Sequence, residues 1–282
     1  MSIVVTGATG HLGRLIVESL LSRGVPAEAV VALGRDVAKI ADLDERGVDV
    51  RHADYGDLEG LTAAFKGADV LMFVSGSEAG QRLPQHRNVV DAAKAAGVGR
   101  VVYTSAPKAD TSSLILAAEH RATEQMIAES GLPYTVLRNG WYLENYTGQL
   151  PTYLEHGVAG AAGDGRISAA TRADLAEAAA AVLVGGGHES RVYELGGEPF
   201  TLSELAAAVS AATGRQVAYT DLSEQAYTQV LVGAGLPEPY AAVLADADRG
   251  ARQGDLYVDR ADLERLLGRP ATPLAEAIRA AL

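Results

Sequence analysis

A chain of 282 residues is long enough for one large domain, or for one domain with a smaller appendage. The absence of cysteine excludes disulfides, cysteine nucleophiles and thiolate metal sites, and the six histidines are too widely spaced to form a local metal-ligand pair. A net charge of −12 argues against nucleic acid or an anionic membrane surface as a partner. Because the chain has no run of 18 apolar residues and begins with a strand-like segment, we expect a cytoplasmic protein without a metal.

The N-terminal segment carries the strongest signal. An apolar run at residues 3–5 passes directly into Gly7, Gly10 and Gly13, which predicts a strand, a tight turn and a helix. The helix N-terminus offers free N–H groups and a favourable dipole to a pyrophosphate. Because the chain has 31 glycines, a purely structural glycine turn stays open as the alternative. The cofactor-binding residues that this motif predicts are Gly7, Ala8, Thr9, Gly10, His11 and Leu12.

Strand-like and helix-like segments alternate through the first half of the chain. The alternation predicts an α/β fold, a doubly wound parallel-sheet Rossmann domain. The further predicted strands cover residues 29–33, 48–52, 70–74, 101–104 and 134–137, and the predicted helices cover residues 37–46, 58–65, 85–96 and 114–130.

The pattern changes from about residue 139 onward. Short strands are predicted at 192–195 and 217–220, and helices at 202–213, 224–233, 239–247, 260–267 and 273–281. Thr201 with Glu204 predicts a capping box, and Thr272 before Pro273 predicts an N-cap with proline in the first turn. We therefore expect a cofactor-binding Rossmann domain at 1–138, with part of 166–185 packing back on it. A smaller, mainly helical substrate lobe is expected at 139–282.

The residues that follow the second and third predicted strands bear on cofactor choice. Gly34 leaves space and Arg35 offers a positive charge to a 2′-phosphate, so we expect NADP(H). The alternative is that Arg35 is an ordinary surface residue and Asp36 serves NAD. Asp54 and Tyr55 follow the third strand, where the adenine commonly lies, although Asp54 is also placed to cap the next helix.

Further cofactor candidates follow from the ends of the remaining strands, because ligands bind outside the carboxyl ends of parallel strands. They are Ser75, Gly76, Thr104, Ser105, Arg138, Asn139, Gly140 and Trp141. Asn139 and Asn145 can donate hydrogen bonds to an acceptor oxygen, and Trp141 and Tyr142 offer flat faces to an aromatic acceptor. Core packing between the two lobes is the alternative for these two aromatic residues. For His86 and Gln85 we favour a capping or solvent role, and we read Lys108 as a solvated charge.

These motifs together resemble a known family. Residues 6–13, Arg35 and residues 53–57, 80–88, 103–105 and 137–146 look like those of the NmrA-like atypical short-chain dehydrogenase/reductases. The resemblance is strongest to the bacterial type-2 NADPH:quinone oxidoreductases, with triphenylmethane reductases as near relatives. It implies an NADPH-dependent, flavin-free reductase whose small substrate lobe and Rossmann domain hold nicotinamide and quinone between them. Residues 106–108 depart from the family pattern, which leaves substrate preference open.

One expected motif is missing. None of the 11 tyrosines is followed four positions later by lysine, so ketone reduction with a lysine-assisted tyrosine acid is not expected. Reduction of a quinone demands less, because the oxygen that gains charge becomes a phenolate whose conjugate acid has a pKa of roughly 10. Water or a hydrogen-bond donor then suffices. The catalytic candidates are Asn145, Tyr103 and Tyr142.

The sequence thus favours hydride transfer from NADPH to a small-molecule quinone. Two alternatives remain open: reduction of another conjugated aromatic acceptor, such as a triarylmethane dye, an azo dye or an enone, and a non-catalytic redox sensor that binds NADP(H). No nucleic acid, membrane, flavin or metal is expected as a partner, and a homodimer is left open.

Overall fold

The computed structural model describes residues 1–76, 78 and 80–282, and the chain divides into two compact units. Unit 1 comprises Met1–Ser105, Glu119–Arg138 and Arg172–Tyr193. Unit 2 comprises Ala106–Ala118, Asn139–Thr171 and Glu194–Leu282. Each unit is therefore assembled from three separate stretches of chain. Within the described residues, no helix is both long enough and apolar enough to cross a membrane.

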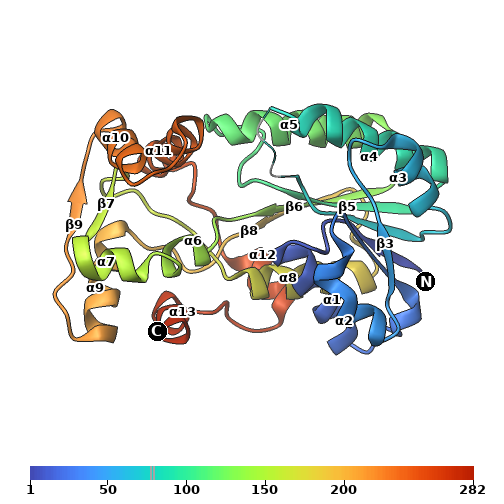
Figure 1. Cartoon of the computed structure of the whole chain (residues 1–282), viewed down its shortest axis with the longest axis horizontal. Helices are drawn as coiled ribbons and strands as arrows, with labels where there is room; N and C mark the ends of the chain where they lie inside the picture. Colours follow the sequence, from blue (N-terminus) through green and yellow to red (C-terminus); the bar gives the residue numbers. More distant parts are fainter. Residues whose placement is uncertain (77, 79) are drawn as a thin grey trace. The chain divides into compact units, whose positions relative to one another are not determined.

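Unit 1 is built on a seven-stranded sheet in the order β3-β2-β1-β4-β5-β6-β8 (Figure 1). Each neighbouring pair from β3 through β6 is parallel. The strand order reverses between β1 and β4, which is where a doubly wound sheet binds its ligands. The strands are β1 (Ile3–Val5), β2 (Val30–Gly34), β3 (Asp49–His52), β4 (Val70–Phe73), β5 (Arg100–Ser105), β6 (Tyr134–Asn139) and β8 (Arg191–Leu195). The predicted α/β class is confirmed.

Helices cover both faces of this sheet. Helices α3, α4 and α5 lie on one face in Figure 1, and α1 packs against α8 on the other. Between the sheet and α3 and α4, a core that includes Phe65, Phe73 and Tyr103 is fully buried. The helices are α1 (His11–Ser22), α2 (Ala41–Glu45), α3 (Leu58–Ala64), α4 (Arg82–Ala96), α5 (Ile115–Glu129) and α8 (Arg172–Val184).

Unit 2 is mainly helical, as predicted. Its helices are α6 (Glu144–Thr147), α7 (Leu150–His156), α9 (Leu202–Thr213), α10 (Glu224–Gly233), α11 (Glu238–Gln253), α12 (Ala261–Leu267) and α13 (Leu274–Ala281). A two-stranded parallel sheet pairs β7 (Val158–Gly160) with β9 (Tyr219–Asp221). The predicted capping box is present at α9, where Thr201 and Glu204 satisfy each other's backbone N–H groups.

Some predicted elements were wrong in detail. The segment predicted as a helix at 37–46 is a 3₁₀ turn, Val37–Ile40, followed by the short α2. Helix α11 runs to Gln253, beyond the predicted end at 247. The pattern missed its last turns because the residues that they bury, Asp248, Gly250 and Ala251, show no apolar periodicity. At α13 the N-cap position is held by Pro273, whose extended backbone suits that position, and not by Thr272.

Candidate functional site

The turn after β1 requires its glycines for steric reasons. Gly7 has φ +63°, in the left-handed region. A Cβ on Gly13 would lie 2.2 Å from the carbonyl oxygen of Gly7, so only glycine lets α1 pack this close to the turn. Gly10 is the N-cap of α1, and among the described residues no side chain caps this helix and its first turn carries no acidic residue. The N-terminal N–H groups of α1 are therefore suited to an anionic group.

The next strand end brings Arg35 to the same edge of the sheet. A Cβ on Gly34 would lie 2.3 Å from Cγ2 of Thr9, so this position also requires glycine. The Arg35 side chain is 62% exposed and forms an ion pair with Glu78. Asp36, the alternative residue for an NAD-type site, lies 3.7 Å from the Nζ atom of Lys39. An exposed cation thus lies at the end of β2.

After β3, Asp54 and Tyr55 have different tasks. Oδ1 of Asp54 accepts the N–H of Gly56 at 2.7 Å, within its own turn. Asp57 caps α3 through the N–H of Gly60, so the alternative that Asp54 is that cap is wrong. The Tyr55 hydroxyl lies 2.6 Å from both Thr6 Oγ1 and the Val74 carbonyl oxygen, and burial raises its pKa. Tyr55 therefore ties the ends of β1 and β4 together.

The segment after β4 is held on both sides. Ser75 donates its N–H to Oγ1 of Thr104 at 2.8 Å. The N–H of Gly76 donates to Nε2 of His86 at 3.0 Å, while the Gly76 carbonyl oxygen accepts from Nε of Arg82 at 2.8 Å. Both backbone groups of Gly76 are thereby fixed by side chains of α4. The sequence did not indicate this clamp.

His86 is a buried acceptor, which corrects the predicted capping or solvent role. Its Nδ1 lies 2.9 Å from Oγ1 of Thr123, and that hydroxyl donates to the Glu119 carbonyl oxygen at 2.9 Å. Nδ1 must therefore carry the proton, which leaves the Nε2 lone pair for Gly76. Burial, helped by the nearby Arg82 charge, lowers the pKa of His86 to about 3. The ring stays neutral at physiological pH.

The hydroxyl of Tyr103 is committed to a second buried histidine. It lies 2.7 Å from Nδ1 of His120, and Tyr103 is fully buried in the core of unit 1. Burial raises the pKa of Tyr103 and lowers that of His120 to about 3. This position favours an orienting role for the tyrosine over direct proton donation.

Ser105 and Arg138 both bind the carboxylate of Glu124, a residue that the sequence did not indicate. The two residues are direct neighbours in the β5–β6 register. Arg138 binds Glu124 with Nε and Nη2 at 3.0 and 2.8 Å, and Ser105 donates its hydroxyl to the same carboxylate. Glu124 belongs to the polar face of α5 that also holds His120 and Thr123. The signal for this polar face in the sequence was the helical spacing of its polar residues with the apolar residues Ala117 and Ile127, which are buried.

The segment after β6 lies in unit 2. Position 140 accommodates only glycine, because a Cβ on Gly140 would lie 2.4 Å from the Ser168 carbonyl oxygen. Asn139, at the end of β6, is 6% exposed, and within the described residues its buried Oδ1 has no hydrogen-bond partner. Trp141 is partly buried and packs on the core of unit 2. Asn139 thus keeps an acceptor available for a ligand N–H group.

Tyr142 and Asn145 lie three residues apart in the turn that begins α6. The N–H of Asn145 donates to the Tyr142 carbonyl oxygen at 3.0 Å, and the side chains of both residues are partly buried. The turn is anchored on either side of Tyr142, because Ala170 accepts from Leu143 and donates to Trp141. The two catalytic candidates of unit 2 are therefore neighbours on a fixed backbone.

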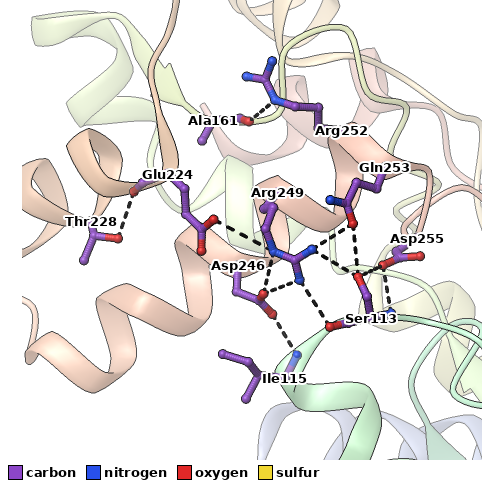
Figure 2. Close-up of polar contacts among 10 residues, drawn as sticks. All are labelled: Ser113, Ile115, Ala161, Glu224, Thr228, Asp246, Arg249, Arg252, Gln253 and Asp255. Carbon is purple, nitrogen blue, oxygen red and sulfur yellow. Dashed lines mark hydrogen bonds and ion pairs between the residues drawn. The ribbon is translucent and has the colours of Figure 1, made fainter.

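The segment that departs from the family pattern is firmly anchored in unit 2. Lys108 has φ +49°, its N–H lies 3.1 Å from Oε2 of Glu194, and its Nζ donates to the Gly254 carbonyl oxygen at 2.9 Å. The interpretation of Lys108 as a solvated charge was wrong. Further along, Asp246 accepts the N–H of Ile115 at 2.8 Å (Figure 2).

Unit 2 also contains an open pocket of about 540 Å³. Its charged lining is balanced: Arg249 donates to Asp246, and Arg252 binds both oxygens of Asp221 at 2.7 and 2.9 Å. Figure 2 shows Arg249 also directed at Ser113 and Gln253. Both arginines are thus paired with groups of unit 2. Within the described part of the chain, no group of three His, Asp or Glu side chains is placed to hold a metal ion.

Comparisons with known proteins agree with this geometry. Residues 7–184 match the model of a family described as NAD(P)H-binding. Quinone oxidoreductase 2 of Escherichia coli strain K12 is 52% identical over 278 residues, covering 98% of this chain and 97% of that protein. A crystal structure of the NADPH-dependent E. coli enzyme complexed with NADPH covers 98% of both chains with a TM-score of 0.95. A Citrobacter sp. triphenylmethane reductase complexed with NADP(H) is 40% identical, with full coverage of both chains and a TM-score of 0.95.

Proposed function

Since the chain belongs to the NAD(P)H-binding family, we propose that it is an NADPH-dependent, flavin-free reductase that transfers a hydride to a quinone. The observation that carries the proposal is the 52% identity, over nearly the full length of both chains, to an NADPH-dependent quinone oxidoreductase. Arg35 at the end of β2, with Gly34 before it, supports NADPH over NADH. We also propose a cytoplasmic location, which suits a chain without cysteine.

The residues of the sheet edge fit a dinucleotide. We assign the pyrophosphate to the turn of Gly7, Ala8, Thr9, Gly10, His11 and Leu12, the 2′-phosphate to Arg35, and the adenine side to Asp54 and Tyr55. The orphaned Oδ1 of Asn139 suits an amide donor. The remaining candidates for cofactor contact are Ser75, Gly76, Thr104, Ser105, Arg138, Gly140 and Trp141. Accordingly, we propose residues 1–138, with part of 166–185 packing back on them, as the cofactor-binding domain and the rest of 139–282 as the smaller substrate lobe.

The bound cofactor supplies the hydride, and the protein positions the acceptor and excludes water. In the balanced reaction NADPH, a proton and the quinone give NADP⁺ and the hydroquinone. Asn145 donates a hydrogen bond to the quinone oxygen that gains charge, and Trp141 and Tyr142 contact the ring. A positioned strong acid is not required, because the product oxygen has a phenol-like pKa of roughly 10. Tyr103, bound to His120, orients the end of β5.

A second acceptor class is supported by one observation. The chain is 40% identical to a triphenylmethane reductase over the full length of both chains. A cationic triarylmethane dye accepts a hydride at its central carbon without needing a proton. Such an acceptor would use the same aromatic contacts as a quinone.

NADPH oxidation in the presence of a small quinone panel, with NADH measured in parallel, tests the proposal. We expect turnover of simple benzoquinones and naphthoquinones with NADPH and a much lower kcat/KM with NADH. Oxidation of a triarylmethane dye panel under the same conditions measures the second acceptor class. Tight NADP(H) binding without turnover of any acceptor would instead identify a redox sensor.

A further inference from the structure

Glu78 and Gln85 are placed around the cation that is proposed to read the 2′-phosphate. Oε1 of Glu78 pairs with Nη1 of Arg35, and Oε2 accepts from Nε2 of Gln85 at 2.7 Å. The hydrogen bond from Gln85 and the ion pair with Arg35 lower the pKa of Glu78. Glu78 is therefore ionised at neutral pH and is held by a residue of α4. Both side chains of the ion pair are accessible, at 62% and 39% exposure.

The Glu78 carboxylate and a 2′-phosphate require the same guanidinium. Glu78 occupies Nη1 of Arg35, and a phosphate that approaches this guanidinium also approaches the negative charge of Glu78. We infer that Glu78 is a specificity-determining residue: it competes with the 2′-phosphate of NADP(H) for Arg35 and so limits the preference for NADPH over NADH. This inference rests on the proposed function, in which Arg35 binds that phosphate.

The expected size of the competition is modest. An exposed ion pair contributes about 0.2–1 kcal/mol, which corresponds to a factor of up to about fivefold in a dissociation constant. Asp54 adds a second negative charge near Glu78, so the local field is not set by Glu78 alone. The inference predicts that removing the Glu78 charge tightens the binding of 2′-phosphorylated nucleotides, while the charge of Asp54 remains.

The variant Glu78→Gln tests the inference, because glutamine keeps the shape and the hydrogen bond to Gln85. Titration calorimetry with adenosine 2′,5′-bisphosphate and with AMP separates the effect on the 2′-phosphate from the effect on the rest of the nucleotide. We expect the dissociation constant of the bisphosphate to fall about three- to fivefold at low salt and that of AMP to change less than about twofold. The gain should shrink at high ionic strength.

Glu28→Gln is the matched control. Glu28 is exposed and precedes β2, whereas Arg35 follows it, so this variant removes the same charge from the opposite end of one strand. An equal gain in Glu28→Gln would show a general charge effect and overturn the inference. An unchanged bisphosphate affinity in Glu78→Gln would overturn it as well.

Arg35→Ala separates this inference from the proposed function. If Arg35→Ala selectively weakens the bisphosphate while Glu78→Gln has no effect, Arg35 reads the phosphate but Glu78 does not compete for it. If Arg35→Ala weakens the bisphosphate and AMP equally, Arg35 is not the phosphate residue and both assignments fail. In the Arg35→Ala background, Glu78→Gln should bring less than half of its gain on the bisphosphate, because the contested cation is gone. A full gain in that background would contradict direct competition.

Discussion

Nε2 of His86 accepts the backbone N–H of Gly76 at 3.0 Å, so that a fully buried side chain of α4 fixes the segment after β4. The carbonyl oxygen of the same glycine accepts from Arg82. A Cβ on Gly76 would lie 3.6 Å from His86 Nε2 and 3.4 Å from Gln85 Oε1, so Gly76 is within ordinary packing distance of both α4 side chains. The strand end that is proposed to border the cofactor is thus held in place by two side chains of α4.

Replacing His86 by leucine tests this clamp. His86→Leu leaves the Gly76 N–H without its acceptor, which should lower the free energy of unfolding by about 1–3 kcal/mol. The dissociation constant of NADPH should rise as well, because the segment loses its fixed position. Denaturant unfolding and a binding titration measure the two effects. His156→Leu is the control, because His156 is 66% exposed, and it should stay within about 0.5 kcal/mol. Equal stability of the two variants would contradict the clamp.

The two buried histidines predict a loss of stability in acid. The pKa values of His86 and His120 are lowered to about 3 from an ordinary value of 6.5, so below pH 6.5 the unfolded chain binds protons that the folded chain does not. Each histidine should therefore reduce the free energy of unfolding by about 1.4 kcal/mol per pH unit between pH 6.5 and 3. Asp248, whose pKa burial raises to about 6, acts in the opposite direction between pH 6 and 3.8.

His120→Gln isolates one of these contributions. The difference in unfolding free energy between the unaltered protein and this variant should shrink by about 2 kcal/mol from pH 6.5 to pH 5. Denaturant unfolding at several pH values measures the difference. A pH-independent difference would show that His120 does not stay neutral in the folded protein.

Tyr103→Phe should affect turnover only modestly. Its hydroxyl is bound to His120 in the core, and a quinone does not need a strong positioned acid. The loss in kcat with a simple benzoquinone should stay well short of the 10²–10⁴-fold expected for removal of a general acid. A steady-state assay of the purified variant decides the matter. A loss within that range would identify Tyr103 as the proton donor and refute the orienting role.

Asn145→Ala and Trp141→Ala should differ in kind. If Asn145 donates to the quinone oxygen as charge develops, its loss lowers kcat and kcat/KM together, because the interaction forms mainly in the transition state. The loss of Trp141 should chiefly raise the quinone KM, because ring contacts hold the ground state and the transition state about equally. NADPH binding should survive in Asn145→Ala. Full quinone turnover by that variant would move the acceptor to the segment at 106–108.

The sequence predicted the positions that backbone geometry dictates. Gly7 and Gly13 are required by a positive φ and by a close approach, and both demands appear as glycines at fixed spacing before a helix. The strand-end residues of unit 1 follow in the same way, because parallel strands bring their carboxyl ends to one edge. The capping box of α9 is equally local, since Thr201 and Glu204 are three residues apart.

The residues that hold those strand ends could not be predicted in the same way. His86, Glu124 and Lys108 each act through a partner outside their own helix or turn, namely Gly76, Arg138 and Gly254, which are 10, 14 and 146 residues away. Such pairs depend on how α4 and α5 pack on the sheet and on how α11 packs in unit 2. The sequence does not show whether a histidine is buried, and burial is what makes His86 a neutral acceptor.

The most direct test of the proposed function is the stoichiometry of anaerobic turnover with 1,4-benzoquinone. We predict that one NADPH is consumed for each hydroquinone formed, without added flavin and without a semiquinone signal in electron paramagnetic resonance. NADH at the same concentration should react far more slowly, and Arg35→Ala should reduce that difference. A rate no higher than the protein-free blank, or a semiquinone that accumulates in proportion to enzyme, would contradict two-electron quinone reduction by this protein.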